Sequence, residues 1–253
     1  MIESSAYAPP ALAAVDNLVD LLSERAAHSP QKTVFAFLAD GENVSLQYNF
    51  DELDRHARAI AAELQARHLT GERAMLLFPS GIEYLAAFFG CLYAGVVAVP
   101  VYPPQMGRQF GRIASIFQDA KASLFFSSRS VFETLEKHGN EELNTQDGKW
   151  LIMEDIPIDQ ASNWKRPEVS ANTLAFLQYT SGSTGDPKGV MVTHGNLMHN
   201  ERMIYDAFGS DSDYIYVSWL PLFHDMGLIG NALQAVYAGI TIHLISPTTF
   251  LQR

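Results

Sequence analysis

The chain has 253 residues and is 47% hydrophobic, so it can bury the core of one large domain or of two small ones. Its 17 Lys and Arg against 28 Asp and Glu give a formal net charge of −11, which argues against nucleic acid or an anionic membrane as a partner. The single cysteine, Cys91, excludes an intramolecular disulfide and fits a reducing compartment, so we expect the protein in the cytoplasm.

The sequence divides into a short leader and a long globular part. Residues 1–14 are rich in Ala, Ser and Pro and predict a flexible leader, without the basic segment and apolar core of a signal peptide. In residues 15–253, helical and strand patterns alternate. Helices are expected at 17–27, 49–64, 80–94, 108–120, 131–138, 196–208 and 225–237. Strands are expected at 34–38, 44–48, 74–78, 96–101, 124–126, 150–153, 174–179, 190–192, 214–219 and 240–245.

This alternation predicts an α/β fold with mixed, largely parallel sheets covered by helices on both faces. The turn at 40–43 predicts a hairpin between the first two strands. Capping boxes are expected where Asn49 precedes Glu52 and where Ser80 precedes Glu83. We expect His194 to cap the helix that follows it.

One stretch, 84–102, carries no charge and is near the length of a membrane-spanning helix. Gly95 interrupts it as a helix C-terminal stop, and Pro100 and Pro103 would disrupt a spanning helix. We therefore expect a helix followed by a buried strand, and no membrane span.

Residues 180–189, TSGSTGDPKG, have the composition of a phosphate-binding loop. Glycines let main-chain N–H groups approach an anion closely, and Ser and Thr hydroxyls add donors. Lys188 supplies a positive charge suited to phosphate. The candidate phosphate-binding residues are Thr180, Ser181, Gly182, Ser183, Thr184, Gly185 and Lys188.

Two other interpretations fit this loop less well. A surface turn or flexible linker has a similar composition, but apolar runs flank this loop on both sides and Pro187 stiffens it. The P-loop of NTPases needs a glycine where this sequence has Pro187 and Ser or Thr where it has Gly189. The P-loop of NTPases also precedes a helix, whereas a strand is expected after residues 180–189. The loop of this sequence therefore belongs to another kind of phosphate site.

A second polar group, His224-Asp225-Met226-Gly227, lies at an expected strand-to-helix switch. Open α/β sheets bind ligands at such switches. A lone His beside apolar residues is more often a core residue, and Asp225 could simply cap the following helix. Three aromatic residues are expected mainly in the core, although a few of them could line a ligand channel: Trp219, Phe223 and Tyr237.

Residues 179–189 resemble the Ser/Thr/Gly-rich signature of the adenylate-forming superfamily, which includes acyl-CoA synthetases, peptide-synthetase adenylation domains and luciferases. Two further stretches, 98–104 (AVPVYPP) and 218–228 (SWLPLFHDMGL), resemble fatty acyl-AMP ligases more than their CoA-using relatives. The similarity runs from about Asp16 onward.

The resemblance implies that ATP activates a medium- or long-chain fatty acid as an acyl adenylate, with release of pyrophosphate. The acyl group would then pass to the phosphopantetheine arm of an acyl carrier protein. The loop at 180–189 would hold the ATP phosphates, and His224 would be a catalytic residue near the acyl carboxylate. Asp225, Met226 and Gly227 would shape the acyl and adenylate site.

In this superfamily the adenine and ribose sites, the Mg²⁺ ligand and the catalytic lysine of the small C-terminal domain come later than the motifs above, so we expect them beyond Arg253. Residues 15–253 would then be the first part of a large adenylation domain and inactive alone. Two alternatives stay open. A long-chain acyl-CoA ligase shares the first half-reaction, and a non-catalytic nucleotide-binding or interaction module could keep the loop without turnover.

Overall fold

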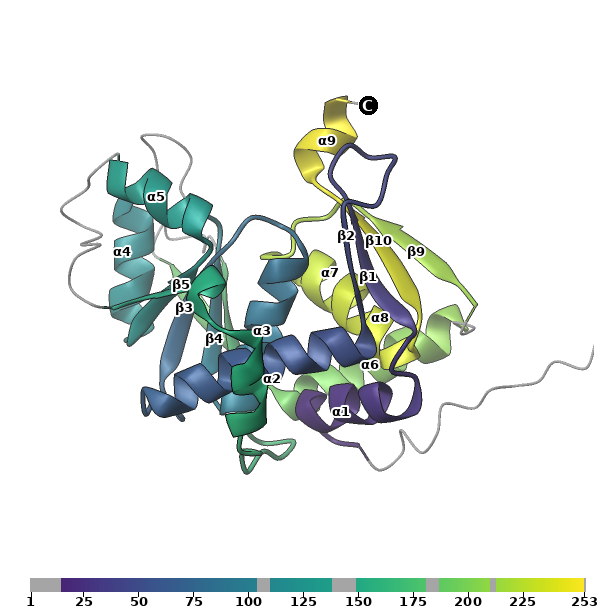
Figure 1. The fold of residues 1–253 in the computed structure, drawn as a ribbon, viewed down its shortest axis with the longest axis horizontal. Coiled ribbons are helices and arrows are strands. Elements are labelled where there is room, and N and C mark those ends of the chain that lie inside the picture. Colours follow the sequence, from purple (N-terminus) through teal and green to yellow (C-terminus); the bar gives the residue numbers. More distant parts are fainter. Residues whose placement is uncertain (1–14, 104–109, 138–148, 181–186, 210–212, 253) are drawn as a thin grey trace, which may run out of the picture.

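The computed structural model describes residues 15–103, 110–137, 149–180, 187–209 and 213–252. They form an α/β fold with a six-stranded and a four-stranded sheet (Figure 1). The leader expected at 1–14 lies outside the described residues.

The six-stranded sheet has the order β6-β5-β3-β4-β7-β8. Its strands are β3 (Arg73–Leu77), β4 (Val97–Val101), β5 (Leu124–Ser127), β6 (Trp150–Ile152), β7 (Leu174–Thr180) and β8 (Lys188–Thr193). All neighbours pair in parallel except β7 and β8, which are antiparallel. The largely parallel sheet expected from the sequence is thus confirmed.

The four-stranded sheet has the order β2-β1-β10-β9. Its strands are β1 (Thr33–Leu38), β2 (Leu46–Asn49), β9 (Ile215–Ser218) and β10 (Thr241–Ile245). The antiparallel β1–β2 hairpin was expected, and it is confirmed. Strand β10 inserts between β1 and β9 and pairs with both in parallel, so this sheet joins the two ends of the described chain.

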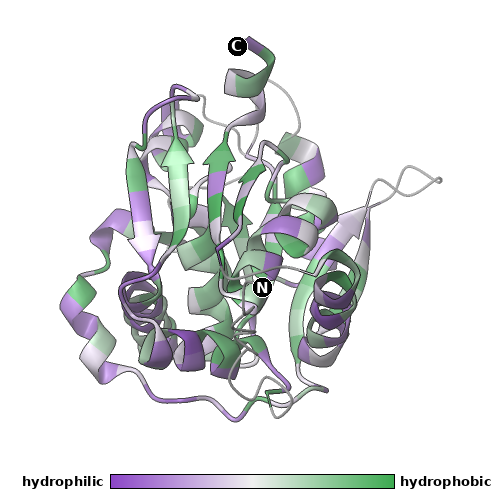
Figure 2. Cartoon of the chain, turned by 90° about the vertical axis from the view of Figure 1, so that its right-hand side faces the viewer, coloured by the Kyte–Doolittle hydropathy of each residue, from purple (hydrophilic) through white to green (hydrophobic). Residues whose placement is uncertain are grey.

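The six-stranded sheet separates two hydrophobic cores. The larger core joins the inner faces of both sheets to α1 (Leu18–His28), α2 (Phe50–Ala66), α3 (Ile82–Ala94), α6 (His194–Phe208) and α8 (Gln234–Ala238). The smaller core lies on the other face of the six-stranded sheet, under α4 (Phe110–Asp119) and α5 (Arg129–Lys137) (Figure 1). Figure 2 shows hydrophobic residues along the strands and hydrophilic residues on helix surfaces turned outward.

Strand β3 contributes side chains to both cores. Ala74 and Leu76 belong to the larger core, whereas Met75 and Leu77 belong to the smaller one. Successive side chains point to opposite faces of a strand, so a strand covered on both faces has an unbroken apolar run. Cover on both faces is confirmed for this sheet, while β9 of the other sheet leaves Ile215 and Val217 61% and 55% exposed.

Several local signals form as expected. Asn49 and Glu52 form the reciprocal capping box that begins α2. Gly95 ends α3 in the left-handed conformation, with φ of 68°, which a residue with a Cβ adopts at a cost. The uncharged stretch is therefore a helix and a buried strand. Among the described residues, no helix is long and apolar enough to cross a membrane.

Two capping predictions are wrong. Helix α3 begins after Gly81 without a side-chain cap, and the Ser80 hydroxyl instead accepts a hydrogen bond from the backbone N–H of Leu222. Thr193, not His194, caps α6. His194 is buried, and its Nδ1 accepts a hydrogen bond from the backbone N–H of Leu18. In both cases the side chain that the local pattern assigned to a helix end instead accepts a hydrogen bond from a segment far away in the sequence.

The helix expected at 225–237 is divided into three parts: α7 (Asp225–Gly227), a π-helix (Leu228–Leu233) and α8. Gly239 ends it, as φ of 71° shows. The other elements are short: 3₁₀ turns at Met153–Asp155 and Ile158–Asn163, and α9 (Pro247–Gln252).

A buried polar pair joins α6 to α8. Glu201 and Gln234 have no exposed surface. With the amide oriented to satisfy its hydrogen bonds, the Gln234 nitrogen donates to Glu201 Oε2 at 2.6 Å and to the Glu201 carbonyl at 3.0 Å. Burial raises the pKa of the Glu201 carboxyl to about 9, so this side chain is neutral in the folded protein at neutral pH.

We expect Glu201→Gln to remove the part of the pH dependence of the free energy of unfolding that comes from titration of the Glu201 carboxyl. The unfolded carboxyl loses its proton near pH 4.5, and the folded one near pH 9. The free energy of unfolding of the wild type should therefore fall as pH rises through this window. Near pH 8 the variant should be more stable by roughly 1–3 kcal/mol. Denaturant unfolding of both proteins at several pH values measures this, and a constant difference across the window would contradict it.

Candidate active site

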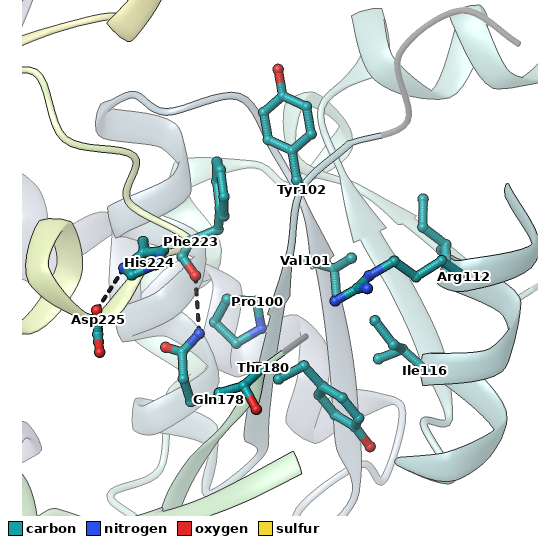
Figure 3. A pocket seen from close by; sticks show the side chains of 12 residues that line it. Pro100, Val101, Tyr102, Arg112, Ile116, Gln178, Thr180, Phe223, His224 and Asp225 are labelled. Carbon is teal, nitrogen blue, oxygen red and sulfur yellow. Dashed lines mark hydrogen bonds and ion pairs between the residues drawn. The ribbon is translucent and has the colours of Figure 1, made fainter. Parts of the chain in front are cut away.

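A cavity of about 500 Å³ lies at the carboxyl ends of β4 and β7 (Figure 3). Strand β4, helix α4, strand β7 and the turn before α7 contribute its walls. The lining residues are Pro100, Val101, Tyr102, Arg112, Ile113, Ile116, Gln178, Tyr179, Thr180, Phe223, His224 and Asp225. This is the edge at which open α/β sheets bind ligands, and it brings both sequence motifs to one place.

The expected phosphate loop connects β7 to β8. Thr180 lines the cavity at the end of β7, and it pairs in register with Lys188, the first residue of β8. Lys188 is exposed and forms no ion pair with another described residue. A strand rather than a helix follows the loop, as expected. The other predicted phosphate-binding residues lie outside the described residues: Ser181, Gly182, Ser183, Thr184 and Gly185.

His224 and Asp225 face the cavity from the opposite side. His224 Nδ1 lies 2.5 Å from Asp225 Oδ1 (Figure 3), and both side chains are more than 60% exposed. Asp225 is the first residue of α7, and His224 holds the N-cap position without a side-chain cap. Asp225 is therefore not the N-cap residue. Its carboxylate accepts from the Met226 N–H and orients the imidazole.

Contacts from the six-stranded sheet fix the turn that carries His224. The Gln178 side-chain amide donates to the carbonyl of Phe223 at 3.1 Å (Figure 3). Ser80 accepts from Leu222 N–H at the same distance. The first bond joins β7 to the turn after β9, and the second joins the loop after β3 to the same turn. The position of His224 therefore depends on both sheets.

Gly227 lets α7 pack against this turn. A Cβ at Gly227 would lie 2.2 Å from the carbonyl oxygen of Pro221, much closer than atoms can approach. That carbonyl also accepts the His224 N–H. Gly227 is buried and is placed in the site as a packing residue, not as a lining one.

Several residues that line the cavity carry no clear signal in the sequence. Gln178 was predicted only as a strand residue and Arg112 only as part of a helix, whereas Tyr179 was included in the 179–189 stretch without a role in the site. Arg112 reaches from α4 toward the cavity in Figure 3. The Tyr179 hydroxyl donates to Asp119 at 2.5 Å; burial, and then this bond, raise the pKa of Tyr179. The exposed polar positions of α4 are the one local signal that could have indicated Arg112. No local pattern separates Gln178 from the other residues of β7.

The aromatic residues expected in the core divide into three cases. Tyr237 is a core residue, 6% exposed. Phe223 instead lines the cavity and packs against Tyr102, with ring centroids 4.7 Å apart. Trp219 is 41% exposed and stacks on Phe250. Trp219 is therefore not a core residue, and Phe223 follows the alternative of a residue that lines a cavity; both come after β9 ends at Ser218.

A second hollow, an apolar groove of about 440 Å³, lies between α6 and the π-helix. Asp225 lines both the groove and the cavity, so the two hollows adjoin at this residue. Met226, Ile229 and Gly230 form one wall of the groove. The others lining it are Val192, Asn196, Leu197, Asn200 and Ile204.

The family model of AMP-binding enzymes matches residues 22–253. The chain belongs to this family. The resemblance to adenylate-forming enzymes is thereby confirmed, and so is the fold expected from it.

Among the relatives of this chain is the medium-chain-fatty-acid–[acyl-carrier-protein] ligase JamA of Moorena producens, 43% identical over 93% of this chain and 40% of that protein. The long-chain-fatty-acid–AMP ligase FadD32 of Mycobacterium marinum is 33% identical over 94% of this chain and 38% of its own. The chain thus spans about 40% of the length of these relatives.

A similar solved structure is that of a fatty acyl-adenylate ligase from Legionella pneumophila in complex with acyl adenylate and pyrophosphate. It is 38% identical, with a TM-score of 0.88 over 96% of this chain and 42% of that chain.

Two glycine substitutions test the packing of the site. Gly227→Ala should lower the free energy of unfolding by about 1–3 kcal/mol, because its Cβ collides with the Pro221 carbonyl. Gly230→Ala is the matched control, since its nearest atom, Met226 Sδ, would lie at an ordinary 3.7 Å. It should be neutral or raise stability by up to about 1 kcal/mol. Denaturant unfolding measures both, and equal effects of the two changes would contradict the packing described.

Proposed function

We propose that this chain carries part of the active site of a fatty acyl-AMP ligase. The single observation that supports this best is the cavity itself. It lies between the strand pair that holds Thr180 and Lys188 and the turn that holds His224 and Asp225. An apolar groove adjoins it at Asp225. The phosphate site, the polar centre and the apolar groove would hold the ATP phosphates, the reacting carboxyl group and the acyl chain, which come together when an acyl adenylate forms.

In the proposed reaction the fatty acid carboxylate attacks the α-phosphate of ATP. The new carboxyl oxygen–phosphorus bond forms as the bond to the bridging oxygen breaks, and pyrophosphate leaves with its electron pair. Negative charge accumulates on the phosphate oxygens in this transition state, so the protein acts chiefly by positioning and electrostatic stabilisation.

The residues divide into two roles. Lys188 and the 180–185 loop would stabilise the β- and γ-phosphates, where a positive charge is most useful. His224, oriented by Asp225, would donate a hydrogen bond near the carboxylate and the α-phosphate. Met226 and the groove would take the acyl chain, because their surface is apolar.

Mg²⁺ is expected to accompany ATP and to neutralise phosphate charge. The part of the chain that the structure describes has no cluster of three or more His, Cys, Asp or Glu side chains that could hold a metal ion.

Acyl carrier protein is the proposed acceptor, in the cytoplasm. The name of the relative JamA, an acyl-carrier-protein ligase, supports this choice, as do the stretches at 98–104 and 218–228. Another relative, a protein of Mycobacterium tuberculosis that is 34% identical, is named a putative fatty-acid–CoA ligase, so free CoA is the rival acceptor.

Half-reaction kinetics on the full-length protein test the two roles. Lys188→Ala removes a charge-assisted phosphate contact of about 1.5–3 kcal/mol, so adenylation should slow roughly ten- to hundredfold. Acyl transfer from preformed acyl-AMP should hardly change, because pyrophosphate has already left. His224→Ala should impair use of the fatty acid and leave ATP binding nearly intact.

Lys137→Ala is the matched control, because it removes the same charge from an exposed position on α5. It should leave both half-reactions unchanged. The roles would be wrong if Lys188→Ala slowed acyl transfer as much as adenylation. They would also be wrong if His224→Ala weakened ATP binding and spared the fatty acid.

Acceptor choice is tested with the wild-type full-length protein. Acyl-AMP should form, as hydroxamate trapping detects, and the acyl group should pass to a carrier protein but not to free CoA. Efficient acyl-CoA formation would favour the CoA ligase. Absence of acyl-AMP with any fatty acid would leave a non-catalytic module.

A further inference from the structure

The wall of the apolar groove is built on an unusual helix. Residues 228–233 form a π-helix, a conformation that is rare and is frequently found at functional sites. Its hydrogen bonds join residues five positions apart instead of four, so each hydrogen-bonded ring contains one more residue than in an α-helix. Ile229 and Gly230, which line the groove, lie within it.

A side chain stabilises the start of the π-helix. Asn231 Nδ2 donates to the carbonyl of Met226 at 2.7 Å. Met226 precedes Asn231 by five residues, the spacing of the π-helix itself. The bond thereby ties the exposed groove residue Met226 to the next turn.

The buried pair stabilises the other end. Gln234 is the first residue of α8, directly after the π-helix, and it donates to both the side chain and the backbone of Glu201. Glu201 lies one residue after Asn200, which lines the opposite wall of the groove. A hydrogen-bonded pair without exposed surface defines the position of α8 against α6 closely.

We propose that Glu201, Gln234 and Asn231 are positioning residues that hold this helix in its π-register and thereby set the acyl-chain preference of the groove. The inference rests on the proposed function. If the π-helix changed to an α-helix, the residues before it would move by one position relative to α8. This is a rotation of about 100° and a shift of about 1.5 Å, which would turn Met226 and Ile229 away from the groove.

The experiment measures fatty acid specificity of the full-length protein. Fatty acid-dependent ATP–pyrophosphate exchange is followed with a medium-chain and a long-chain fatty acid at saturating ATP. Glu201→Leu should change the ratio of the two kcat/KM values about tenfold or more, with the KM for ATP unchanged. Glu201→Gln keeps a hydrogen-bonding partner for Gln234 and should retain the wild-type ratio.

Two further variants separate positioning from stability. Leu53→Ala truncates a buried residue of α2, destabilises the protein and should leave the ratio unchanged. Asn231→Ala removes the bond to Met226 from an incompletely buried position and should shift the ratio in the same direction as Glu201→Leu. If Glu201→Leu does not fold, Asn231→Ala decides the question.

An unchanged ratio in a folded Glu201→Leu protein or in Asn231→Ala would overturn the inference. So would an equal shift in Leu53→Ala or in Glu201→Gln. In each of these cases the wild type still forms acyl-AMP, so the proposed function stands. A wild type without exchange for any fatty acid would overturn both.

Discussion

The hydrogen bond from the Gln178 side chain to the Phe223 carbonyl joins the two halves of the site. Gln178 lies on β7, two residues before the end of the strand that leads into the phosphate loop. Phe223 lies in the turn after β9, directly before His224. The two strands belong to different sheets, so the cavity forms only when both sheets pack on their common core. The geometry of the site therefore depends on how the two sheets pack against each other.

The packing around this bond favours a single arrangement of the turn. The Ser80 hydroxyl, in the loop after β3, accepts a hydrogen bond from the Leu222 N–H. Gly227, which has no Cβ, lets α7 pack directly against the Pro221 carbonyl. Close packing of this kind tolerates few alternatives. The exposed His224–Asp225 pair thus sits on a rigid base, which is what an electrostatic role in catalysis requires. Beneath it, Glu201 and Gln234 place polar groups in an otherwise apolar core, where each unsatisfied atom is costly.

Local patterns predicted the elements, and long-range contacts explain what they missed. The Asn49–Glu52 capping box and the Gly95 stop involve neighbours in sequence, so they were predicted correctly. Ser80 and His194 bond segments more than 140 residues away, and no local rule contains those partners. The 225–237 segment has an ordinary helical pattern, while its π-helix depends on Asn231 and on Gln234 meeting Glu201. Both site motifs were recognised, yet Gln178 and Arg112 were not, because only tertiary contacts bring these two residues to the cavity.

The central claim is that one cavity holds the phosphate and the acyl carboxyl group side by side. A crystal structure of the full-length protein with a non-hydrolysable acyl-adenylate analogue tests it most directly. The account predicts that the phosphate-equivalent group lies between Thr180 and His224, with the acyl chain passing Asp225 into the groove beside Ile229. An analogue bound away from Thr180, or an acyl chain that leaves the cavity on the α4 side, would contradict it.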